Sequence, residues 1–180
     1  TTIPDLPETV TPDRIVIPEG LDFSNYDFTL AGEPHRWGDY VIGEQIDHVD
    51  GVTVEESEHM LATRLWQNTA KVHFDATNRE DGKRLIYGGH VISMARALSF
   101  NGLANAGQVL AINAGTHASP LFAGDTIYAW SEVLDKADLS EKCGALRLRL
   151  VAVKDQDPAA FAYKTSDGKY ADGVLLDFDY

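Results

Sequence analysis

The chain has 180 residues, of which 44% are hydrophobic, and its formal net charge is −13. This length and apolar content suit one globular domain, while the acidic charge argues against a nucleic-acid partner, whose phosphates attract basic proteins. No apolar run reaches the roughly 18 residues that a membrane helix needs, which argues against a membrane partner. The single cysteine, Cys143, excludes an internal disulfide and suits a reducing compartment, so we expect a cytoplasmic protein.

The start of the sequence is rich in proline. Residues 1–32 contain four of the seven prolines, and X-Pro pairs favour extended backbone. This segment is therefore predicted to be an arm or an inter-repeat linker, followed by a domain at residues 33–180. The simplest interpretation of a linker in this place is that another domain precedes it.

A short strand is predicted to lead into a helix that begins after Thr53. Thr53 and Glu56 have the spacing of a capping box, in which a hydroxyl and a carboxylate satisfy the first N–H groups of a helix. Val54, Leu61 and Leu65 recur at helical spacing. The helix is expected to end near Gln67, which places the next eight residues, "NTAKVHFD", on a loop.

Residues 91–104 are predicted to form a buried core helix. Arg96 is the only charged residue among them, and about 14 residues are too few to span a membrane. Such a lone charge must find a partner or a ligand. Gly88 and Gly89 come directly before this helix, where backbone N–H groups lack partners. These glycines indicate either a tight turn with positive φ or a set of oxyanion donors.

The remaining sequence is typical of antiparallel strands. In residues 145–153, leucines alternate with Arg147 and Arg149, as expected for a strand with one buried face. Asp167-Gly168 is a hairpin signal between two apolar segments. Strands are expected at residues 108–122, 126–134, 145–153, 159–165 and 173–180. One buried helix with such strands predicts an α+β domain whose sheet wraps around the helix.

His73 is the strongest candidate for chemistry, because histidine exchanges a proton near neutral pH. It lies in sequence near Asn68 and Asp75. Asp75 would orient His73 or cap a helical turn, and His90 would line the same cavity or cap the central helix. The structural alternative for His73 is a histidine bonded to backbone at a helix-to-loop corner.

The other histidines are interpreted as structural or as lacking partners: His35, His48, His59 and His117. No pair of histidines has a convincing metal-ligand spacing, so no metal is expected. The sequence also contains no GxSxG, phosphate-binding loop or dinucleotide fingerprint.

The segment "QNTAKVHFD" followed by "RLIYGGHVISMARALSFNGLANA" resembles the MaoC-like hot-dog hydratases. In that family, the motif Asp-x-Asn-Pro-x-His is followed seventeen residues later by a second histidine at the head of the central helix. His73 and His90 reproduce this spacing. "PLFAGDTIYAWSEVL" also resembles the strand pair that carries the family's Gly-Asp-Thr turn. The resemblance covers residues 37–180 and implies the hot-dog fold, a curved antiparallel sheet around one long central helix.

The resemblance implies a reaction, the reversible addition of water to an enoyl thioester of coenzyme A. His73 would be the base, and the N–H groups around Gly89 and His90 would hold the enolate oxygen. The sequence is most similar to a branch of tandem hot-dog repeats that acts on mesaconyl-CoA and β-methylmalyl-CoA, and it resembles the second repeat. Coenzyme A is then part of the substrate, and no separate cofactor is expected. Arg84 and Arg96 are candidates for binding its anionic groups.

One departure from the family pattern leaves alternatives open. The family's catalytic aspartate falls on Asn68, whose amide accepts no proton at neutral pH but can position water. Either His73 performs both proton transfers through water, or a carboxylate such as Asp75 supplies the second group, or the site is inactive. A non-catalytic hot-dog module that binds acyl-CoA or a partner subunit therefore remains an alternative.

A thioesterase on the same fold is a further alternative, although "GGHVISMAR" lacks the carboxylate that it would use. Because hot-dog units pair, we also expect a homo-oligomer or pairing with a preceding repeat.

Overall fold

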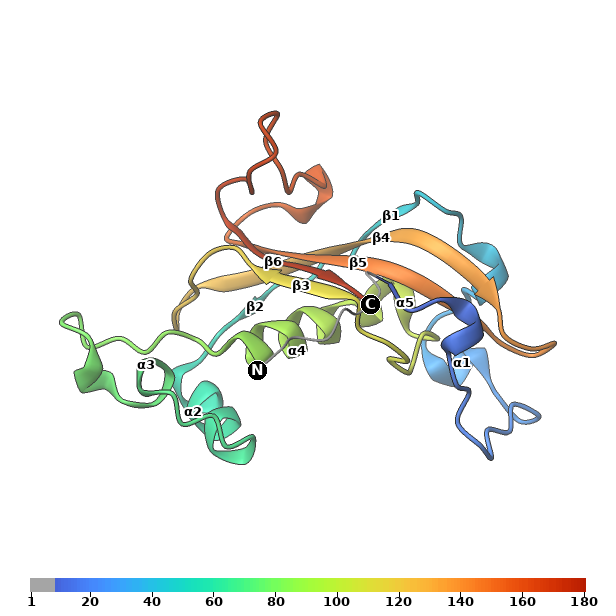
Figure 1. Ribbon diagram of the computed structural model, residues 1–180, viewed down its shortest axis with the longest axis horizontal. Helices are drawn as coiled ribbons and strands as arrows, with labels where there is room; N and C mark the ends of the chain where they lie inside the picture. Colours follow the sequence, from blue (N-terminus) through green and yellow to red (C-terminus); the bar gives the residue numbers. More distant parts are fainter. Residues whose placement is uncertain (1–8) are drawn as a thin grey trace, which may run out of the picture.

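Six strands form one antiparallel sheet in the computed structural model, which describes residues 9–180 (Figure 1). The strand order is β1-β4-β5-β6-β3, and β2 also pairs with β4. The strands are β1 (Gln45–Asp47), β2 (Val52–Thr53), β3 (Ala114–His117), β4 (Thr126–Asp138), β5 (Gly144–Lys154) and β6 (Val174–Asp179). The α-helices are α1 (Phe28–Ala31), α2 (Glu56–Leu65), α3 (Lys71–Phe74), α4 (Gly88–Leu98) and α5 (Phe100–Leu103). Four 3-10 turns among the described residues complete the fold: η1 (Pro12–Arg14), η2 (Trp37–Asp39), η3 (Ala76–Asn78) and η4 (Pro158–Ala160).

The alternating pattern of β5 is confirmed. Leu148 and Leu150 point into the core and are buried. Arg147 and Arg149 point to the other face, where Arg147 donates to Asp179 of β6 with an Nε–Oδ1 distance of 2.9 Å. Opposite charges on neighbouring strands thus face one another on the outer side of the sheet.

The predicted hairpin around Asp167-Gly168 is wrong as a strand pair. β6 pairs with β5 and β3 instead, and residues 159–165 contain η4 and a single bridge from Lys164 to Tyr170. Phe161 has a φ of 48°, which interrupts an extended strand. Residues 174–176 are fully buried, so tertiary pairing on both edges of β6 outweighs the local turn signal. The predicted strand at residues 108–122 is shortened to β3.

The start of α2 differs from the predicted capping box. Thr53 lies in β2, where its hydroxyl bonds that of Thr126 at 2.8 Å. The capping box is formed instead by Glu55, the N-cap residue, and Glu58. Because Thr53 belongs to the strand pair of β2 and β4, α2 begins further along the chain. The carboxylates of Glu55 and Glu58 satisfy backbone N–H groups at its start.

The buried face of α2 is also not the predicted one. Leu61 and Leu65 are 57% and 68% exposed, whereas His59, Ala62 and Thr63 are buried. Residues 71–74, which were expected on a loop, form the single helical turn α3. α2 and α3 lie together at one end of the molecule, beside the start of α4 (Figure 1).

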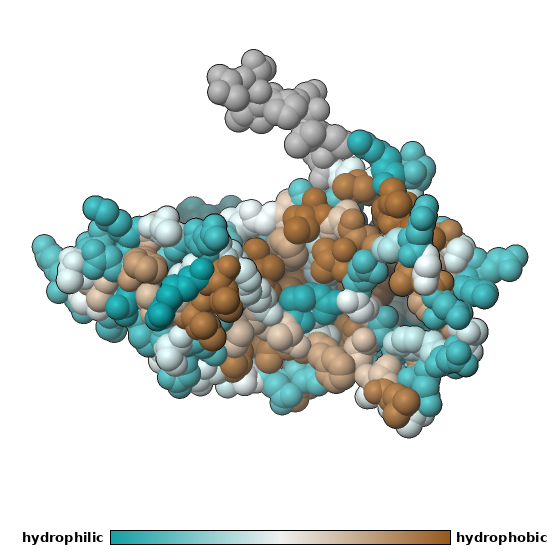
Figure 2. Space-filling view, turned by 90° about the horizontal axis from the view of Figure 1, so that it is seen from below, coloured by the Kyte–Doolittle hydropathy of each residue, from teal (hydrophilic) through white to brown (hydrophobic). Residues whose placement is uncertain are grey.

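The helix α4 packs against the sheet along one face only. Val91 and Ala95 are buried, and Ala95 has no exposed surface. Ser93 and Ala97 on the opposite side are exposed, so the prediction of a helix buried on nearly all faces is wrong. Its core partners on the sheet include Ile127, Ala129, Leu150, Ala152, Leu176 and Phe178. Figure 2 views the molecule from the helix side, where apolar side chains reach the surface in several places.

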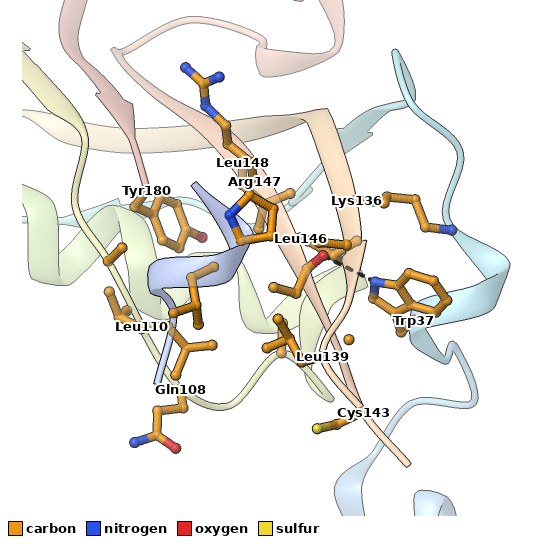
Figure 3. Close-up of a pocket in the computed structure, with 18 of the residues that line it drawn as sticks. Trp37, Gln108, Leu110, Lys136, Leu139, Cys143, Leu146, Arg147, Leu148 and Tyr180 are labelled. Carbon is orange, nitrogen blue, oxygen red and sulfur yellow. Dashed lines mark hydrogen bonds between the residues drawn. The ribbon is translucent and has the colours of Figure 1, made fainter. Parts of the chain in front are cut away.

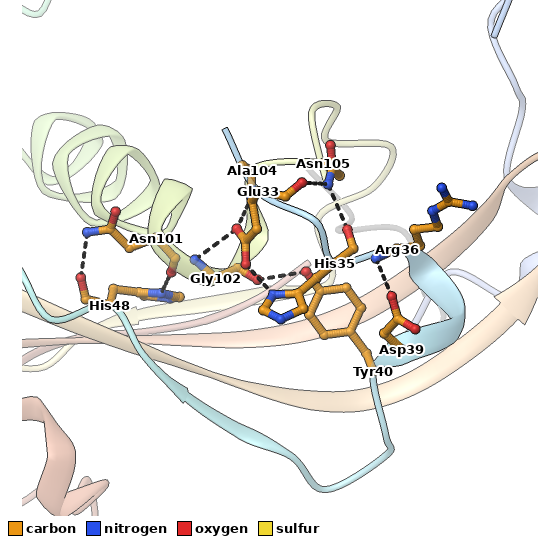
Figure 4. Close-up of polar contacts among 10 residues, drawn as sticks. All are labelled: Glu33, His35, Arg36, Asp39, Tyr40, His48, Asn101, Gly102, Ala104 and Asn105. Carbon is orange, nitrogen blue, oxygen red and sulfur yellow. Dashed lines mark hydrogen bonds and ion pairs between the residues drawn. The ribbon is translucent and has the colours of Figure 1, made fainter. Parts of the chain in front are cut away.

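The predicted central helix breaks before residue 104. Gly102 has a φ of 96°, a left-handed conformation that glycine adopts without steric cost. The Glu33 carboxylate accepts the N–H groups of Gly102 and Ala104, each at 3.1 Å (Figure 4). The Tyr40 hydroxyl donates to the carbonyl of Gly102 at 2.6 Å. The kink is therefore held by side chains that come from the segment before β1.

His48 also holds this kink and is not the unpartnered histidine that was expected. Its Nδ1 lies 2.7 Å from the carbonyl oxygen of Asn101 (Figure 4). Its Nε2 lies 2.8 Å from the hydroxyl of Ser131. The side chain is fully buried, and burial lowers the pKa of His48. A neutral ring with one donor and one acceptor nitrogen satisfies both contacts.

The described part of the N-terminal segment covers a cavity of about 610 Å³ (Figure 3). Its other walls come from the β4–β5 hairpin and the chain that follows α5. Val10 N–H donates to Asn113 Oδ1 at 2.8 Å, and the Tyr26 hydroxyl donates to Asn105 Oδ1 at 2.5 Å. Residues 1–8 of the predicted arm lie outside the described residues. Within residues 9–180, no helix has the length and apolar character that crossing a membrane requires.

The positive φ of Gly102 predicts that a larger residue at this position destabilises the fold. A Cβ atom on Gly102 would lie 2.6 Å from Cγ2 of Ile46, on a backbone with positive φ. We expect Gly102→Ala to lower the free energy of unfolding by about 1–3 kcal/mol in urea titrations. The control is Gly107→Ala, where nothing lies within 4 Å of the added Cβ. Equal stability of the two variants would contradict this account of the kink.

Candidate active site

His73 lies on α3 with one ring nitrogen already bonded. Its Nδ1 is 2.7 Å from the carbonyl oxygen of Leu85, which can only accept a hydrogen bond. The proton of the neutral ring is therefore on Nδ1, and the Nε2 lone pair is available as a base. A second bond, from Leu85 N–H to the Val72 carbonyl at 3.0 Å, ties α3 to the segment before α4. The backbone contact at this corner orients His73 and leaves its Nε2 available.

The start of α4 presents unpaired backbone donors. No side chain caps the helix, and the N–H groups of His90 and Val91 both donate to the carbonyl of Tyr87. Within the described residues, the N–H groups of Gly88 and Gly89 have no hydrogen-bond partner. Because the helix dipole is positive at this end, these donors favour negative charge. The two glycines, rather than His90, thus carry the free N–H groups.

The glycines are required by close packing and not by a tight turn. Neither has a positive φ, so that alternative is wrong. A Cβ atom on Gly88 would lie 2.5 Å from Nε2 of His117, and one on Gly89 would collide with the hydroxyl of Tyr87. The side chains of His117 and Tyr87 therefore flank the helix start, and partial desolvation lowers the pKa of His117.

A third histidine, His59, lies between the two that the sequence indicated. Its ring centroid is 6.4 Å from that of His73 and 6.1 Å from that of His90. Its Nε2 accepts the backbone N–H of Tyr87 at 3.0 Å, so its proton is on Nδ1, which has no partner in the described residues. The side chain is fully buried, and burial together with His90 lowers the pKa of His59 to about 4.

Sequence reasoning missed His59 because its importance arises from packing. Its only sequence signal is its place on the helix α2, 14 residues before His73 and 31 before His90. The buried face of α2 brings it to the start of α4. It was interpreted as a histidine without partners, and the structure corrects this interpretation.

His90 is buried and faces a carboxylate that the sequence did not indicate. Its Nε2 lies 3.5 Å from Oε1 of Glu58, and its Nδ1 has no partner in the described residues. Glu58 also accepts the N–H of Glu55 at 3.0 Å, as part of the cap of α2. α2 therefore supplies both a histidine and a carboxylate to the start of α4.

Asn68 and Asp75 both accept backbone N–H groups close to them in the sequence, and Asp75 caps η3. Asn68 Oδ1 accepts the N–H of Ala70 at 3.2 Å, just before α3. Asp75 Oδ1 accepts the N–H of Thr77 at 2.9 Å and its hydroxyl at 2.7 Å, and these bonds lower the pKa of Asp75. Of the two roles considered for Asp75, the structure has the cap, since Nδ1 of His73 bonds Leu85 instead.

The two candidate arginines lie at opposite ends of α4. Arg84 forms an ion pair with Glu56, and its Nε donates to the carbonyl of Phe74 at 3.1 Å, beside α3. Arg96 lies in the last turn of α4 and lines the cavity of Figure 3. Its guanidinium donates to the Ser99 hydroxyl at 2.6 Å and to the carbonyl of Ala106. Arg96 has thus found the partners that a lone charge requires, away from the three histidines.

Among residues 9–180, no three histidine, cysteine, aspartate or glutamate side chains gather in a way that could hold a metal ion.

Burial of His59 predicts a pH dependence of stability. The histidine has a pKa near 6.5 in the unfolded chain and about 4 in the fold, so the unfolded state binds the proton more tightly. The free energy of unfolding should fall by up to about 3 kcal/mol as the pH drops from above 6.5 to below about 4. In urea titrations between about pH 7 and pH 5, His59→Gln should show a weaker pH dependence than the unmodified protein. Identical slopes would contradict the buried neutral state of His59.

Comparisons with known proteins show that the chain is similar to two named enzymes. The chain is 71% identical over 180 residues to mesaconyl-CoA hydratase of Cereibacter sphaeroides, covering 99% of this chain and 52% of the relative. It is 54% identical over 185 residues to β-methylmalyl-CoA dehydratase of Chloroflexus aurantiacus, covering 100% of this chain and 53% of the relative. The chain thus spans about half the length of the curated relatives it matches. No family model matches it.

Solved structures agree on the fold. A protein described as a MaoC domain dehydratase from Chloroflexus aurantiacus superposes with a TM-score of 0.91 at 52% identity, over 100% of this chain and 53% of that one. A Mycobacterium tuberculosis protein with a double hot-dog fold superposes with a TM-score of 0.58 at 22% identity, over 91% of this chain and 47% of that one. The expected fold and family resemblance are confirmed. The chain therefore has the hot-dog fold and is similar to about half of a mesaconyl-CoA hydratase and to about half of a β-methylmalyl-CoA dehydratase.

Proposed function

We propose that this protein catalyses the reversible addition of water to an enoyl-CoA thioester, with mesaconyl-CoA and β-methylmalyl-CoA as its substrate pair. The observation that carries the proposal is the bond from Nδ1 of His73 to the Leu85 carbonyl, which leaves Nε2 as a base beside the start of α4. The identity of 71% to a mesaconyl-CoA hydratase supports the choice of substrate.

In the hydration direction, His73 Nε2 removes a proton from water as the water oxygen bonds to the β-carbon. Electron density moves to the thioester oxygen, which becomes an enolate oxygen. In this proposal, the N–H groups of Gly88 and Gly89 stabilise this charge at the positive end of the α4 dipole. The α-carbon then takes up a proton, which completes the addition of water.

The second proton requires a group that Asn68 cannot provide, and Asp75 forms no hydrogen bond with His73, whose Nδ1 bonds Leu85. We assign this role to the pair of Glu58 and His90, because Glu58 is the carboxylate beside the helix start. A proton passed from this pair to the α-carbon is replaced by the one that His73 has taken from water.

Coenzyme A carries phosphate groups, and the chain has a net charge of −13, so binding requires lysine or arginine side chains close to the site. Lys71 and Lys83 are exposed around α3 and its following loop, while Arg84 is partly buried in its ion pair with Glu56. These side chains are suited to phosphate or carboxylate groups of the substrate. Coenzyme A enters as part of the substrate, and no separate cofactor is proposed. A cytoplasmic location is proposed from the single cysteine.

We further propose that the domain pairs with a second hot-dog unit, either another copy or a neighbouring repeat. The outer side of α4 is exposed, and β3 is the last strand in the order of the sheet, so its outer edge is open. Large apolar side chains are exposed on α2 and after it, namely Leu61, Leu65 and Trp66. Light scattering coupled to gel filtration would detect a dimer, and a monomer at all concentrations would contradict pairing between copies.

The proposed reaction predicts the effect of removing the base. We expect His73→Ala to lower kcat for hydration of mesaconyl-CoA by about 10²–10⁴-fold, because no other group occupies the place of Nε2. The measurement follows the loss of the enoyl-thioester absorbance. Asp75→Asn is the matched control, since Asp75 caps η3 and its loss should leave kcat within about 3-fold of the unmodified protein.

Three results would separate the alternatives. Equal activity of His73→Ala and the unmodified protein would reject His73 as the base. No turnover by the unmodified protein, with retained binding of CoA esters, would favour the non-catalytic binding module. Turnover of the thioester to free coenzyme A would favour a thioesterase.

The thioesterase remains a second candidate because Glu58 supplies, from α2, the carboxylate that "GGHVISMAR" lacks. In a hydratase, Glu58→Gln should lower the rate of hydration and release no coenzyme A. Detection of free thiol with a chromogenic reagent during turnover distinguishes the two reactions. Thiol release that depends on Glu58 would favour the thioesterase over the hydratase.

A further inference from the structure

His59 has no role in the reaction as proposed, yet it is the most buried member of the three-histidine cluster. It has no exposed surface, and its ring lies within 6.4 Å of both His73 and His90, measured between ring centroids. Burying a polar ring costs free energy unless its nitrogen atoms are bonded. Nδ1 of His59 has no partner in the described residues. Among residues 9–180, the bond made by Nε2 is therefore the one polar contact that offsets the cost of burying this ring.

That bond fixes the backbone where α4 begins. Nε2 of His59 accepts the N–H of Tyr87, and Tyr87 is the N-cap residue of α4. The carbonyl of the same residue accepts the first two intrahelical bonds, from His90 and Val91. Both backbone groups of Tyr87 are therefore occupied, and the peptides of Gly88 and Gly89 directly after it are held in one orientation.

The bond between His59 and the Tyr87 N–H also affects where the Tyr87 side chain lies beside the N–H groups of Gly88 and Gly89. The hydroxyl of Tyr87 lies against Gly89, and its ring centroid is 6.1 Å from that of His73. A change in the Tyr87 backbone would move this ring and the two glycine N–H groups together. It would also alter the separation between these donors and the base on α3.

We propose that His59 is a positioning residue of the hydratase site, which accepts the Tyr87 N–H and thereby sets the Gly88 and Gly89 donors relative to His73. This inference rests on the proposed function. The role requires a neutral ring with Nε2 unprotonated, and the low pKa of His59, about 4, keeps it so at neutral pH. A protonated ring would present a donor to the Tyr87 N–H and lose the contact.

The test compares two substitutions of the same side chain in the intact protein. His59→Gln places an amide oxygen near the position of Nε2 and can accept the Tyr87 N–H, whereas the shorter His59→Asn cannot reach it. We expect His59→Asn to lower kcat with mesaconyl-CoA by about 10- to 100-fold while KM changes by less than about 3-fold. His59→Gln should restore kcat to within about 5-fold of the unmodified protein.

His48→Asn is the matched control, because His48 is equally buried but bonds Asn101 and Ser131 at the other end of α4. We expect it to lower the melting temperature and to leave kcat of the folded protein unchanged. A positioning role for His59 is overturned if His59→Asn loses only thermal stability, as His48→Asn does. It is also overturned if His59→Gln and His59→Asn are equally impaired in kcat.

A spectroscopic measurement keeps this inference separate from the proposed function. In ¹⁵N-resolved NMR spectra, His59→Asn should shift the amide signals of Tyr87, Gly88 and Gly89, and His48→Asn should leave them in place. If the unmodified protein hydrates no enoyl-CoA thioester, the proposed function fails, and these amide signals alone decide whether His59 sets the helix start. Unshifted signals in His59→Asn would overturn the positioning role.

Discussion

The packing of α4 against the inner face of the sheet is the constraint on which the rest of the structure depends. Val91 and the fully buried Ala95 form its contact face, and small side chains allow a helix to approach a sheet closely. The N-terminal end of α4 has no side-chain cap, and the chain kinks at Gly102 beyond its C-terminal end, so that contacts from other segments complete both ends. The candidate active site lies at the N-terminal end of α4, and the kink at Gly102 lies beyond its C-terminal end.

Two buried histidines complete the two ends of α4, and both must be neutral. His48 bonds Asn101 and Ser131 beyond the C-terminal end, and His59 accepts the Tyr87 N–H at the N-terminal end. Burial lowers the pKa of each ring, because a charged imidazolium would lose its hydration without gaining an adequate counterion. The geometry of α4 is therefore linked to pH through groups that do not themselves need to meet a substrate.

The acidic character of the chain is largely used within the fold. Asp27, Asp75 and Asp157 accept backbone N–H groups at the starts of helical turns. Asp177 and Asp179 pair with arginines on the outer face of the sheet. At the start of α4, by contrast, the N–H groups of the two glycines have no carboxylate cap. A developing enolate oxygen would therefore meet free donors in a molecule where several other helical turns begin with an acidic cap.

The sequence by itself determined the α+β class, the alternating strand β5, the spacing of His73 and His90, and the glycines before the central helix. Each of these signals is local, since periodicity and short spacings are properties of neighbouring residues. Only the tertiary structure decided that Glu58 and His59 reach the start of α4, that Asp75 is a cap, and that Arg96 lies at the far end. These positions depend on which face of α2 is buried and on where α4 crosses the sheet, and packing between distant segments leaves no periodic trace in the sequence.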